Sequence, residues 1–560
     1  MKNKSNSREQ GTLNRFCLNV YFISIFAGII LAGFKAGAQV SAVQKAKIDS
    51  IFSSWNSDHT PGMELIILRQ GKKIWNRSFG ESNIASKIPN NNNRPIWVAS
   101  MSKQFTGLAI AMLVDQKKIS LNDDIRKFLP ELPVMPDTVR INHLVYHTSG
   151  LREGFTLTAM SYKGEEEYTN ANVLKYLSRQ TGRNFKPGDR FEYNNSGYVL
   201  LAIIVERVSK MSFPDFTQQH IFKPLGMDHS RFVSVFPQGD TSVATGYAVS
   251  VENGKTVYQP AFFKGQTYGS SALITTADDL VKWDNLFYEP VFGKGVQRLQ
   301  LQKGKLNNGQ LVPYAFGLES DLYKNKIALT HSGVDPGYKS EMLRFPEERF
   351  TVICLANTDD AYNLTNKLFS VAELFIHFDK TVQPDRKLDC PVKAGAYMNM
   401  ETLASMKFLK IKDALSISDS ENGYAQPLAN SGGCRFLIPG NLTDDYFINH
   451  DQIIFSTRAD RIFFHAINPV TPDSNEIRSA AGGWYSPELD ITYHLFEKDG
   501  ILYLKFFEVY DVPLTSYSGN LFVGDFLGTN TIHFVKDEMG NFRTMEFNRE
   551  GIRNLIFIRK

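Results

Sequence analysis

Ser100-Met101-Ser102-Lys103 is a Ser-x-x-Lys motif, and a serine and a lysine at this spacing can support nucleophilic catalysis. A serine hydroxyl needs an adjacent base, and on a helix Lys103 would lie one turn from Ser100 on the same face. The amine can serve as that base where burial or nearby charge lowers its pKa. A helix beginning at Ser100 would also offer free backbone N–H groups to developing negative charge. The alternative is a serine helix cap and an exposed lysine.

A second candidate group is Tyr193-Asn194-Asn195, which follows the turn at 186–189 and precedes an apolar stretch that predicts a helix over 197–210. The Tyr193 phenol can transfer protons, and the Asn195 amide can hold a substrate carbonyl. Three other Tyr-x-Asn matches occur in the chain. The match at Tyr193 alone has a turn before it and a helix after it, which favours it as the functional one.

The third candidate group is His331-Ser332-Gly333, directly after an apolar strand predicted at 327–329. A strand edge at this point can line the nucleophile and provide a backbone N–H for an oxyanion hole. Gly333 at this edge therefore joins the predicted substrate-binding residues. The alternative for His331 is a hydrogen-bonded histidine at a turn.

Metal binding has little support in the sequence. His143 and His147 are one helical turn apart, as are Glu373 and His377, but neither pair has the His-Glu-x-x-His form or a nearby third ligand. Ordinary hydrogen-bonded histidines explain both pairs, so we expect neither a metal nor a cofactor.

The elements that position these groups follow from apolar periodicity and turn residues. Helices are predicted at 42–57, 101–116, 172–180, 197–210, 275–287 (with Thr275 or Thr276 as the cap) and 363–376, and strands at 64–69, 74–79, 327–329, 341–345 and 351–355. Composition then changes, with a predicted linker at 381–391 and short strands separated by Gly, Asp and Asn turns over 392–560. Similar sequences open two stretches of this region, at 394–397 and 482–485, which indicates a twofold repeat and a closed or nearly closed barrel.

Residues 1–38 read as an export signal: a basic region ends at Arg15, an uncharged apolar run spans 16–34, and Ala36-Gly37-Ala38 is a small-x-small cleavage site. The predicted location is therefore periplasmic or secreted, with no membrane span after cleavage; an uncleaved anchor is the alternative. This segment contains five basic residues and one acidic residue, so 57 of each sign remain after it. That balance gives no reason to expect a nucleic-acid partner.

The chain has 4 cysteines. Cys354 lies in an apolar run, which indicates a buried and inert thiol. Cys390 and Cys434 can pair in an oxidising compartment, but their spacing alone leaves that open.

In this order and spacing, the three groups resemble the motifs of the serine β-lactamase and penicillin-binding-protein superfamily. Tyr-x-Asn is typical of its class C branch, and His-Ser-Gly in place of Lys-Thr-Gly is typical of β-lactamase-related esterases and D-amino-acid peptidases. The resemblance covers roughly residues 45–376. Further landmarks are His147-Thr148-Ser149-Gly150, Pro224-Leu225-Gly226-Met227 and Tyr314-Ala315-Phe316-Gly317.

The resemblance implies an α/β domain over 39–380, with an antiparallel sheet flanked by helices and a mainly helical subdomain. The C-terminal region at 392–560 resembles the all-β, lipocalin-like barrel domain of some of these hydrolases. That likeness rests on Gly483-Trp484-Tyr485-Ser486 and on the sequence at 551–557. A packed barrel without a ligand is the alternative for this region.

Residue roles also follow from the resemblance. Ser100 would attack a carbonyl, while Lys103 and Tyr193 would share the general-base and general-acid work. Asn195 would orient the substrate, and His331 would take the place of the third-motif lysine. The backbone N–H groups of Ser100 and Val334 would form the oxyanion hole. His147 is expected to be structural.

These observations predict a serine hydrolase that forms an acyl-enzyme on Ser100 and hydrolyses a small ester or peptide-like amide. A neutral histidine at position 331 makes efficient β-lactam hydrolysis doubtful, because it removes a permanent positive charge near the substrate carboxylate. One alternative is a D-specific peptidase or weak penicillin-recognising enzyme acting on cell-wall fragments. The other is a catalytically silent binding or sensor protein. The sequence leaves the oligomeric state open.

Overall fold

The computed structural model describes residues 40–560 except for several segments. These are 56–58, 162–167, 234, 236–238, 254, 262–264, 360–363, 379–393, 401, 404, 412–413, 419–424, 433, 438–444, 450–451, 457–460, 508, 527–528 and 550. The predicted signal segment and linker lie outside the described residues. In the N-terminal unit, Met1–Ile51, the described part is mainly helix α2 (Ala42–Ile51).

A six-stranded antiparallel sheet, in the order β12-β13-β14-β15-β1-β2, forms the centre of the α/β domain. Strand β1 lies between β2 and β15 and pairs with both. The first strand of the sheet in sequence therefore lies beside the last. Strand β15 is buried along its whole length and supplies the middle of the core. The strands are β1 (Met63–Arg69), β2 (Lys72–Phe79), β12 (Glu319–Tyr323), β13 (Lys326–Asp335), β14 (Tyr338–Phe345) and β15 (Phe350–Ala356).

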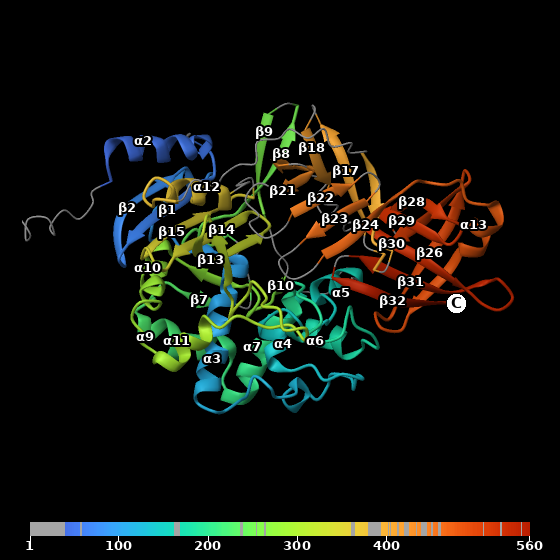
Figure 1. Ribbon diagram of the computed structural model, residues 1–560, viewed down its shortest axis with the longest axis horizontal. Helices are drawn as coiled ribbons and strands as arrows, with labels where there is room; N and C mark the ends of the chain where they lie inside the picture. Colours follow the sequence, from blue (N-terminus) through green and yellow to red (C-terminus); the bar gives the residue numbers. More distant parts are fainter. Residues whose placement is uncertain are drawn as a thin grey trace, which may run out of the picture. The chain divides into compact units, whose positions relative to one another are not determined.

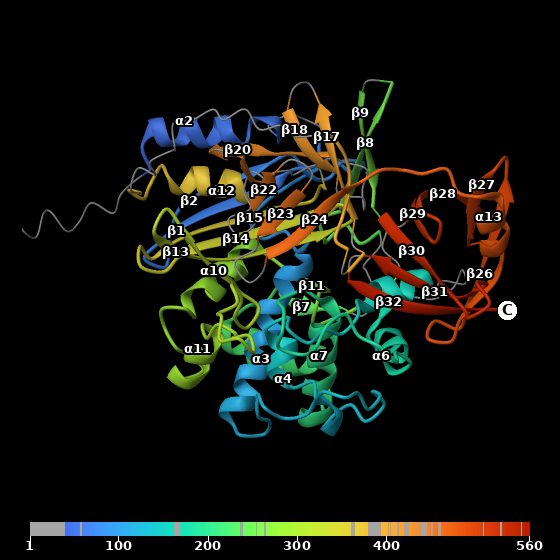
Figure 2. The same ribbon diagram turned by 45° about the vertical axis from the view of Figure 1, so that its right-hand side comes forward.

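The helical part lies between β2 and β12 in sequence. Figures 1 and 2 show α3, α4 and α7 grouped on one side of the sheet, with α12 on its opposite face. Helices α3 and α7 are buried on nearly every side because apolar residues fill most of their positions. The helices are η1 (Ser53–Trp55), η2 (Ala99–Ser102), α3 (Lys103–Asp115), η3 (Ile125–Lys127), α4 (Ile141–Val145), α5 (Gly154–Met160), α6 (Asn170–Ser178), α7 (Asn195–Ser209), α8 (Phe213–Thr217), η4 (Gln218–Phe222), α9 (Lys223–Leu225), α10 (Ala277–Asn285), α11 (Lys294–Gln300) and α12 (Leu364–Ala372).

Short strands connect these helices to the sheet. Strand β11 lies between β5 and β7 in a three-stranded sheet, and β6 pairs with β10. Two hairpins complete the domain, β3–β4 and β8–β9. The bounds are β3 (Glu81–Asn83), β4 (Ile88–Pro89), β5 (Ile96–Trp97), β6 (Tyr168–Thr169), β7 (Arg231–Phe232), β8 (Tyr247–Glu252), β9 (Lys255–Pro260), β10 (Gly265–Gln266) and β11 (Leu273–Thr275).

The predicted elements of this domain are present, with ends that differ by a few residues. The predicted helix at 101–116 begins instead as the 3₁₀ turn η2 and becomes α-helical only at Lys103. The cap that the sequence left open is Thr276, whose Oγ1 accepts a hydrogen bond from the Asp279 N–H at 3.0 Å. The predicted strand at 327–329 is longer in the structure, so His331 lies inside β13.

The predicted C-terminal barrel is confirmed for the last part of the chain, where β25 to β32 form a closed barrel. Aromatic and aliphatic side chains pack together inside it, including Trp484, Tyr493, Phe522 and Phe534. Helix α13 (Ser474–Ala480) precedes it. The strands are β25 (Gly482–Ser486), β26 (Ile491–Lys498), β27 (Ile501–Phe506), β28 (Tyr510–Ser518), β29 (Leu521–Asp525), β30 (Thr529–Lys536), β31 (Phe542–Arg549) and β32 (Ile552–Arg559).

The first half of the region forms a separate nine-stranded sheet, so 392–560 contains two β-modules. Strands β19 and β20 are successive pieces of one segment; β19 pairs with β18, and β20 pairs with β21. Strand β16 also pairs with β24, so the first and last strands of this sheet lie side by side. The strands are β16 (Gly395–Met398), β17 (Ser405–Ile411), β18 (Ala414–Ser418), β19 (Ala425–Pro427), β20 (Ala429–Gly432), β21 (Arg435–Leu437), β22 (Asp445–Asn449), β23 (Gln452–Ser456) and β24 (Arg461–Ile467).

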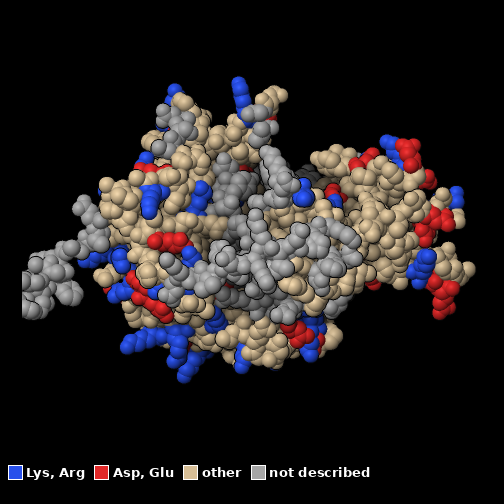
Figure 3. Space-filling model, turned by 45° about the horizontal axis from the view of Figure 1, so that its top comes forward, with Lys and Arg blue, Asp and Glu red and all other residues tan. Residues whose placement is uncertain are grey.

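Among the described residues, no helix is both long and apolar enough to cross a bilayer. Cys354 is buried and free, and Cys434 is disulfide-bonded. Cys390 lies outside the described residues, so its pairing stays a prediction. On the face in Figure 3, Lys and Arg side chains lie among Asp and Glu side chains, in keeping with the nearly equal numbers of basic and acidic residues in the sequence.

Candidate active site

Ser100 lies in η2, immediately before α3, and Lys103 is the first residue of that helix. Ala99 has a φ of +47°, a backbone conformation that is unfavourable for a residue with a Cβ. This turn brings the Lys103 Nζ to 3.0 Å from the Ser100 Oγ. The Ser-x-x-Lys spacing thus places the two groups in direct contact.

The Lys103 amine is fully buried and has three hydrogen-bond acceptors. It donates to the Ser100 hydroxyl, to Asn195 Oδ1 at 2.8 Å and to the Ser270 carbonyl at 2.8 Å. Burial lowers its pKa from 10.5 to about 7, although the nearby carboxylates Glu153 and Asp335 act in the opposite direction. A large fraction of Lys103 is therefore neutral near pH 7 and can accept a proton.

Tyr193 lies over the same amine, whose Nζ is 4.9 Å from the centre of the phenol ring. Burial of the phenol raises its pKa well above the usual value, and a hydrogen bond with Ser100 opposes that shift. The residue as a whole is 38% exposed. His147 packs beneath Tyr193 with ring centres 4.5 Å apart. Tyr193 therefore joins Ser100 and Lys103 at the mouth of the site.

The segment that contains Tyr193 is fixed by its neighbours. The Asn194 N–H donates to His147 Nδ1 at 3.1 Å, and the Asn194 side chain caps α7 by accepting from the Gly197 N–H at 3.1 Å. The Asn195 N–H donates to Glu153 Oε2 at 2.7 Å. As expected from the sequence, His147 has contacts that support the backbone of this segment.

His331 is buried, with 1% of its surface exposed, and both ring nitrogens have partners. Nδ1 lies 2.7 Å from the Ser332 carbonyl, so it must donate, and Nε2 then accepts from the Tyr314 hydroxyl at 2.8 Å. Burial lowers the pKa of His331 to about 3, and the positive charge of Lys103 adds to this shift. The imidazole is therefore neutral at physiological pH.

The edge of β13 passes directly beside the nucleophile turn. A Cβ on Gly333 would lie 2.1 Å from the Val98 carbonyl oxygen and 3.1 Å from the Ser100 nitrogen, so this position requires glycine. Val334, the next residue, has 59% of its surface exposed. The structure thus brings all seven predicted site residues to one place: Ser100, Lys103, Tyr193, Asn195, His331, Gly333 and Val334.

Three further residues complete the site and were not predicted from the sequence. Ser270 accepts from Lys103 through its carbonyl, and Glu153 holds the Asn195 amide. Asp335 accepts from Trp97 Nε1 and from Ser271 Oγ, each at 2.7 Å. Two signals in the sequence were available. One is the run of small residues at 269–272 before an apolar strand, and the other is Asp335, an acid two positions after Gly333 at the strand edge.

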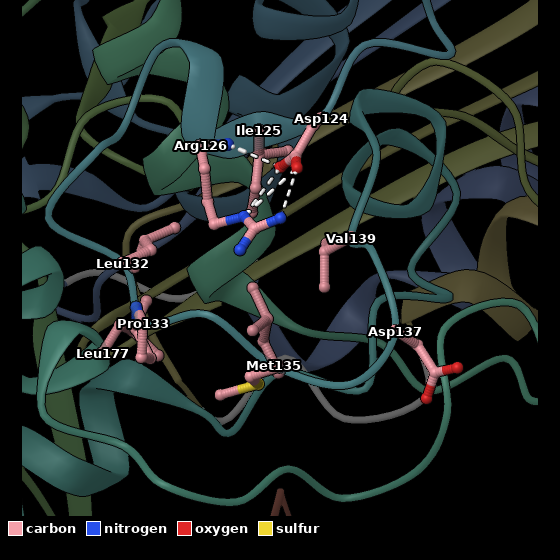
Figure 4. A pocket seen from close by; sticks show the side chains of 10 residues that line it. Asp124, Ile125, Arg126, Leu132, Pro133, Met135, Asp137, Val139 and Leu177 are labelled. Atoms are coloured by element: carbon pink, nitrogen blue, oxygen red, sulfur yellow. Dashed lines mark hydrogen bonds and ion pairs between the residues drawn. The ribbon is translucent and has the colours of Figure 1, made fainter.

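Other candidate sites are weaker. Within the part of the chain that the structure describes, no three His, Cys, Asp or Glu side chains gather as a metal site. His143 Nδ1 instead accepts from the Arg140 N–H. A separate pocket near η3 is lined by Leu132, Pro133 and Met135 (Figure 4). Its Arg126 and Asp124 pair with each other at 2.6 Å.

An antiparallel sheet flanked by helices, with Ser-x-x-Lys, Tyr-x-Asn and a strand edge meeting at one point, defines the β-lactamase and transpeptidase-like class. The chain belongs to the Beta-lactamase family, which matches residues 44–369. This family is part of the β-lactamase and penicillin-binding-protein superfamily, whose members are serine hydrolases.

Individual relatives are distant. Penicillin-binding protein 4* of Bacillus subtilis is 28% identical over 365 residues, which span 63% of this chain and 80% of that protein. Protein flp of Staphylococcus aureus is 28% identical over 333 residues, or 56% of this chain and just 64% of that protein. The octameric penicillin-binding protein homologue from Pyrococcus abyssi has the same fold, with a TM-score of 0.52 and 22% identity over 75% of this chain and 99% of that one.

Proposed function

We propose that the protein hydrolyses a carboxylic ester or a peptide-like amide through an acyl-enzyme on Ser100. The observation that carries this proposal is the buried Lys103 amine, with a pKa of about 7 and 3.0 Å from the Ser100 hydroxyl. Neutral Lys103 takes the Ser100 proton while Oγ forms a bond to the substrate carbonyl carbon. The leaving alcohol or amine departs with a proton, and water then releases the acid and restores Ser100.

Tyr193 and Asn195 support the same reaction. The Tyr193 phenol, hydrogen-bonded with Ser100, shares the proton transfer to the leaving group. Asn195 Oδ1 is occupied by Lys103, which leaves the amide NH₂ to donate to a substrate carbonyl. The N–H groups of Ser100 and Val334 form the oxyanion hole, since β13 runs against the nucleophile turn at Gly333.

The charges around the site favour a substrate without a carboxylate next to the scissile bond. His331 is neutral and its two nitrogens are occupied, so it offers no positive charge to a substrate carboxylate. The carboxyl groups of Glu153 and Asp335 lie close enough to Lys103 to influence its pKa. A negatively charged substrate group would meet repulsion there.

The second candidate is a D-specific peptidase or penicillin-recognising enzyme. It is favoured by the similarity to penicillin-binding protein 4* over 80% of that protein's length. A catalytically silent binding protein is the non-enzymatic alternative. It is disfavoured by the intact contact between Ser100 and Lys103.

The decisive experiment is intact-mass analysis after treatment with a fluorophosphonate and, separately, with benzylpenicillin. We expect a fluorophosphonate adduct on the Ser100 peptide that is absent from Ser100→Ala, and faster hydrolysis of neutral short-chain esters than of D-alanyl peptides with a free carboxylate. Amidated D-alanyl peptides separate the effect of that carboxylate from the effect of the amide bond. Folded wild-type protein that gains no adduct with either reagent would rule out the enzyme.

We propose export to the periplasm or medium with cleavage after Ala38, domains at 39–380 and 392–560 joined by a linker at 381–391, and a lipocalin-like character for the barrel. N-terminal sequencing of the protein secreted by the native cell tests the first point. Limited proteolysis tests the linker.

A further inference from the structure

The turn between β31 and β32 reaches from the C-terminal barrel to the segment that contains Tyr193. The Gly551 carbonyl accepts hydrogen bonds from the Glu153 N–H at 2.8 Å and from Asn184 Nδ2 at 2.9 Å. The Glu153 carboxylate in turn accepts the Asn195 N–H at 2.7 Å. Glu153 therefore links the barrel, at Gly551, directly to the backbone of Asn195, a proposed substrate-binding residue.

A second contact reaches the other side of Tyr193. Arg553 Nη2 pairs with Glu192 Oε2 at 2.7 Å, and the Arg553 N–H donates to Asn184 Oδ1 at 2.9 Å. Asn184 also donates to Glu192 Oε1 at 2.8 Å. Both side chains of the ion pair are less than a quarter exposed, so solvent screens it less than an ordinary surface pair.

A buried ion pair fixes the turn in place. Arg152 pairs with Glu488 of the barrel, and their side chains are only 1% and 2% exposed. The same guanidinium donates to the backbone carbonyls of Arg553 at 3.1 Å and Asn554 at 2.7 Å. The turn is also shaped for this approach: Gly551 has a φ of +71°, and a Cβ there would lie 2.8 Å from the Cβ of Glu153.

We propose that Gly551, in the β31–β32 turn, and Arg553, at the start of β32, form a positioning element of the active site that holds the segment 192–195 in its catalytic geometry. The inference rests on the proposed function, since it assigns a role to Tyr193 and Asn195. Contacts that served only to join two domains would not need to meet at Glu192, directly before Tyr193, and at Asn195, two positions after it. Displacement of a reacting group by about 1 Å can reduce a rate by a factor on the order of 100.

The test compares Arg553→Ala and Glu192→Gln with Arg543→Ala, a matched control on the same barrel. Arg543 pairs with Asp537 and is 66% exposed. For the first two variants we expect kcat for a neutral ester and the fluorophosphonate labelling rate of Ser100 to fall about 10-fold, with a smaller change in KM. Arg553→Lys, which keeps the charge, should recover part of the loss, and Arg543→Ala should retain the wild-type rate.

Hydrogen–deuterium exchange supplies a readout that does not depend on catalysis. Faster exchange in a peptide covering 190–198 is expected for Arg553→Ala and not for Arg543→Ala, because the N–H groups of Glu192, Asn194 and Asn195 are all hydrogen-bonded. Unchanged labelling and unchanged exchange in Arg553→Ala would overturn the proposal. A wild-type protein that is not labelled would contradict the proposed function instead, and the exchange comparison would still decide the positioning role.

Discussion

Ser100 and Lys103 are three positions apart in one helical segment, whereas the segment 192–195, which contains Tyr193, is held by residues 42 and 361 positions away from their partners. The first pair needs only the turn of η2 and the start of α3. The second depends on Glu153 and on Arg553, a residue of the C-terminal barrel. The local half and the non-local half of the site meet at the hydrogen bond between Lys103 and Asn195, and each should respond to different substitutions.

The largest expected effect is on the local half. Lys103→Met removes the base next to Ser100, and we expect the rate of acylation to fall by about 10³- to 10⁴-fold. Fluorophosphonate labelling followed by mass spectrometry measures this rate. A loss of less than tenfold would show that Lys103 is not the base.

The same variant should also be more stable than the wild type near pH 6. Burial lowers the pKa of Lys103 in the folded state from 10.5 to about 7, so the unfolded chain binds the proton more tightly. This cost is fully present below pH 7 and fades as the pH rises toward 10.5. Thermal unfolding at pH 6 and pH 10 therefore checks the sign: the advantage of Lys103→Met should be larger at pH 6.

The second prediction compares two buried ion pairs. Arg152→Ala leaves Glu488 unpaired, and Arg344→Ala does the same to Asp284 inside the α/β domain, where both side chains are 1% exposed. We expect each variant to lose about 3–5 kcal/mol of stability in urea unfolding. Only Arg152→Ala should also speed hydrogen exchange in the peptide covering 190–198 at low urea. Equal exchange in both variants would remove Arg152 from the non-local half.

The sequence predicts the local half better than the non-local half for a physical reason. Ser100 and Lys103 are related by helical spacing, and the apolar period of α3 and α7 identifies the helices that contain the motifs. Glu153 and Asn184 give no such signal, because their roles arise only when β32 docks. The positive φ at Ala99, where β13 passes close by at Gly333, likewise has no signal in the spacing of the motif.

The β-region illustrates the same limit. Turn residues and alternation correctly predict strands, and the twofold repeat indicated by the similar sequences at 394–397 and 482–485 stays a prediction. The spacing does not reveal whether the seventeen short strands described in this region form one barrel or two sheets, because pairing is decided by contacts between strands. The structure resolves this with β16 pairing to β24 and β25 pairing to β32.

A smaller effect is expected from Gly333→Ala, which tests the contact between β13 and the local half. The added Cβ would lie 2.1 Å from the Val98 carbonyl oxygen, so the strand or the nucleophile turn must move. We expect the rate of ester hydrolysis to fall about 100-fold with little change in secondary structure by circular dichroism. Gly395→Ala is the control, since no atom lies within 4 Å of its Cβ position. Equal activity of the two variants would contradict the proposed oxyanion hole.

The smallest effect should come from Glu153→Gln, which keeps a hydrogen-bond acceptor for the Asn195 N–H and removes the negative charge. That charge stabilises the ammonium form of Lys103, so its loss lowers the pKa of Lys103 below about 7. The neutral base is then present at lower pH, and the acid limb of kcat/KM should move to lower pH. Glu131→Gln, at a surface carboxylate paired with Arg207, should leave the profile unchanged. A shift to higher pH would mean that Glu153 acts on Lys103 through geometry and not through charge, and the two halves of the site would then be mechanically coupled at this residue.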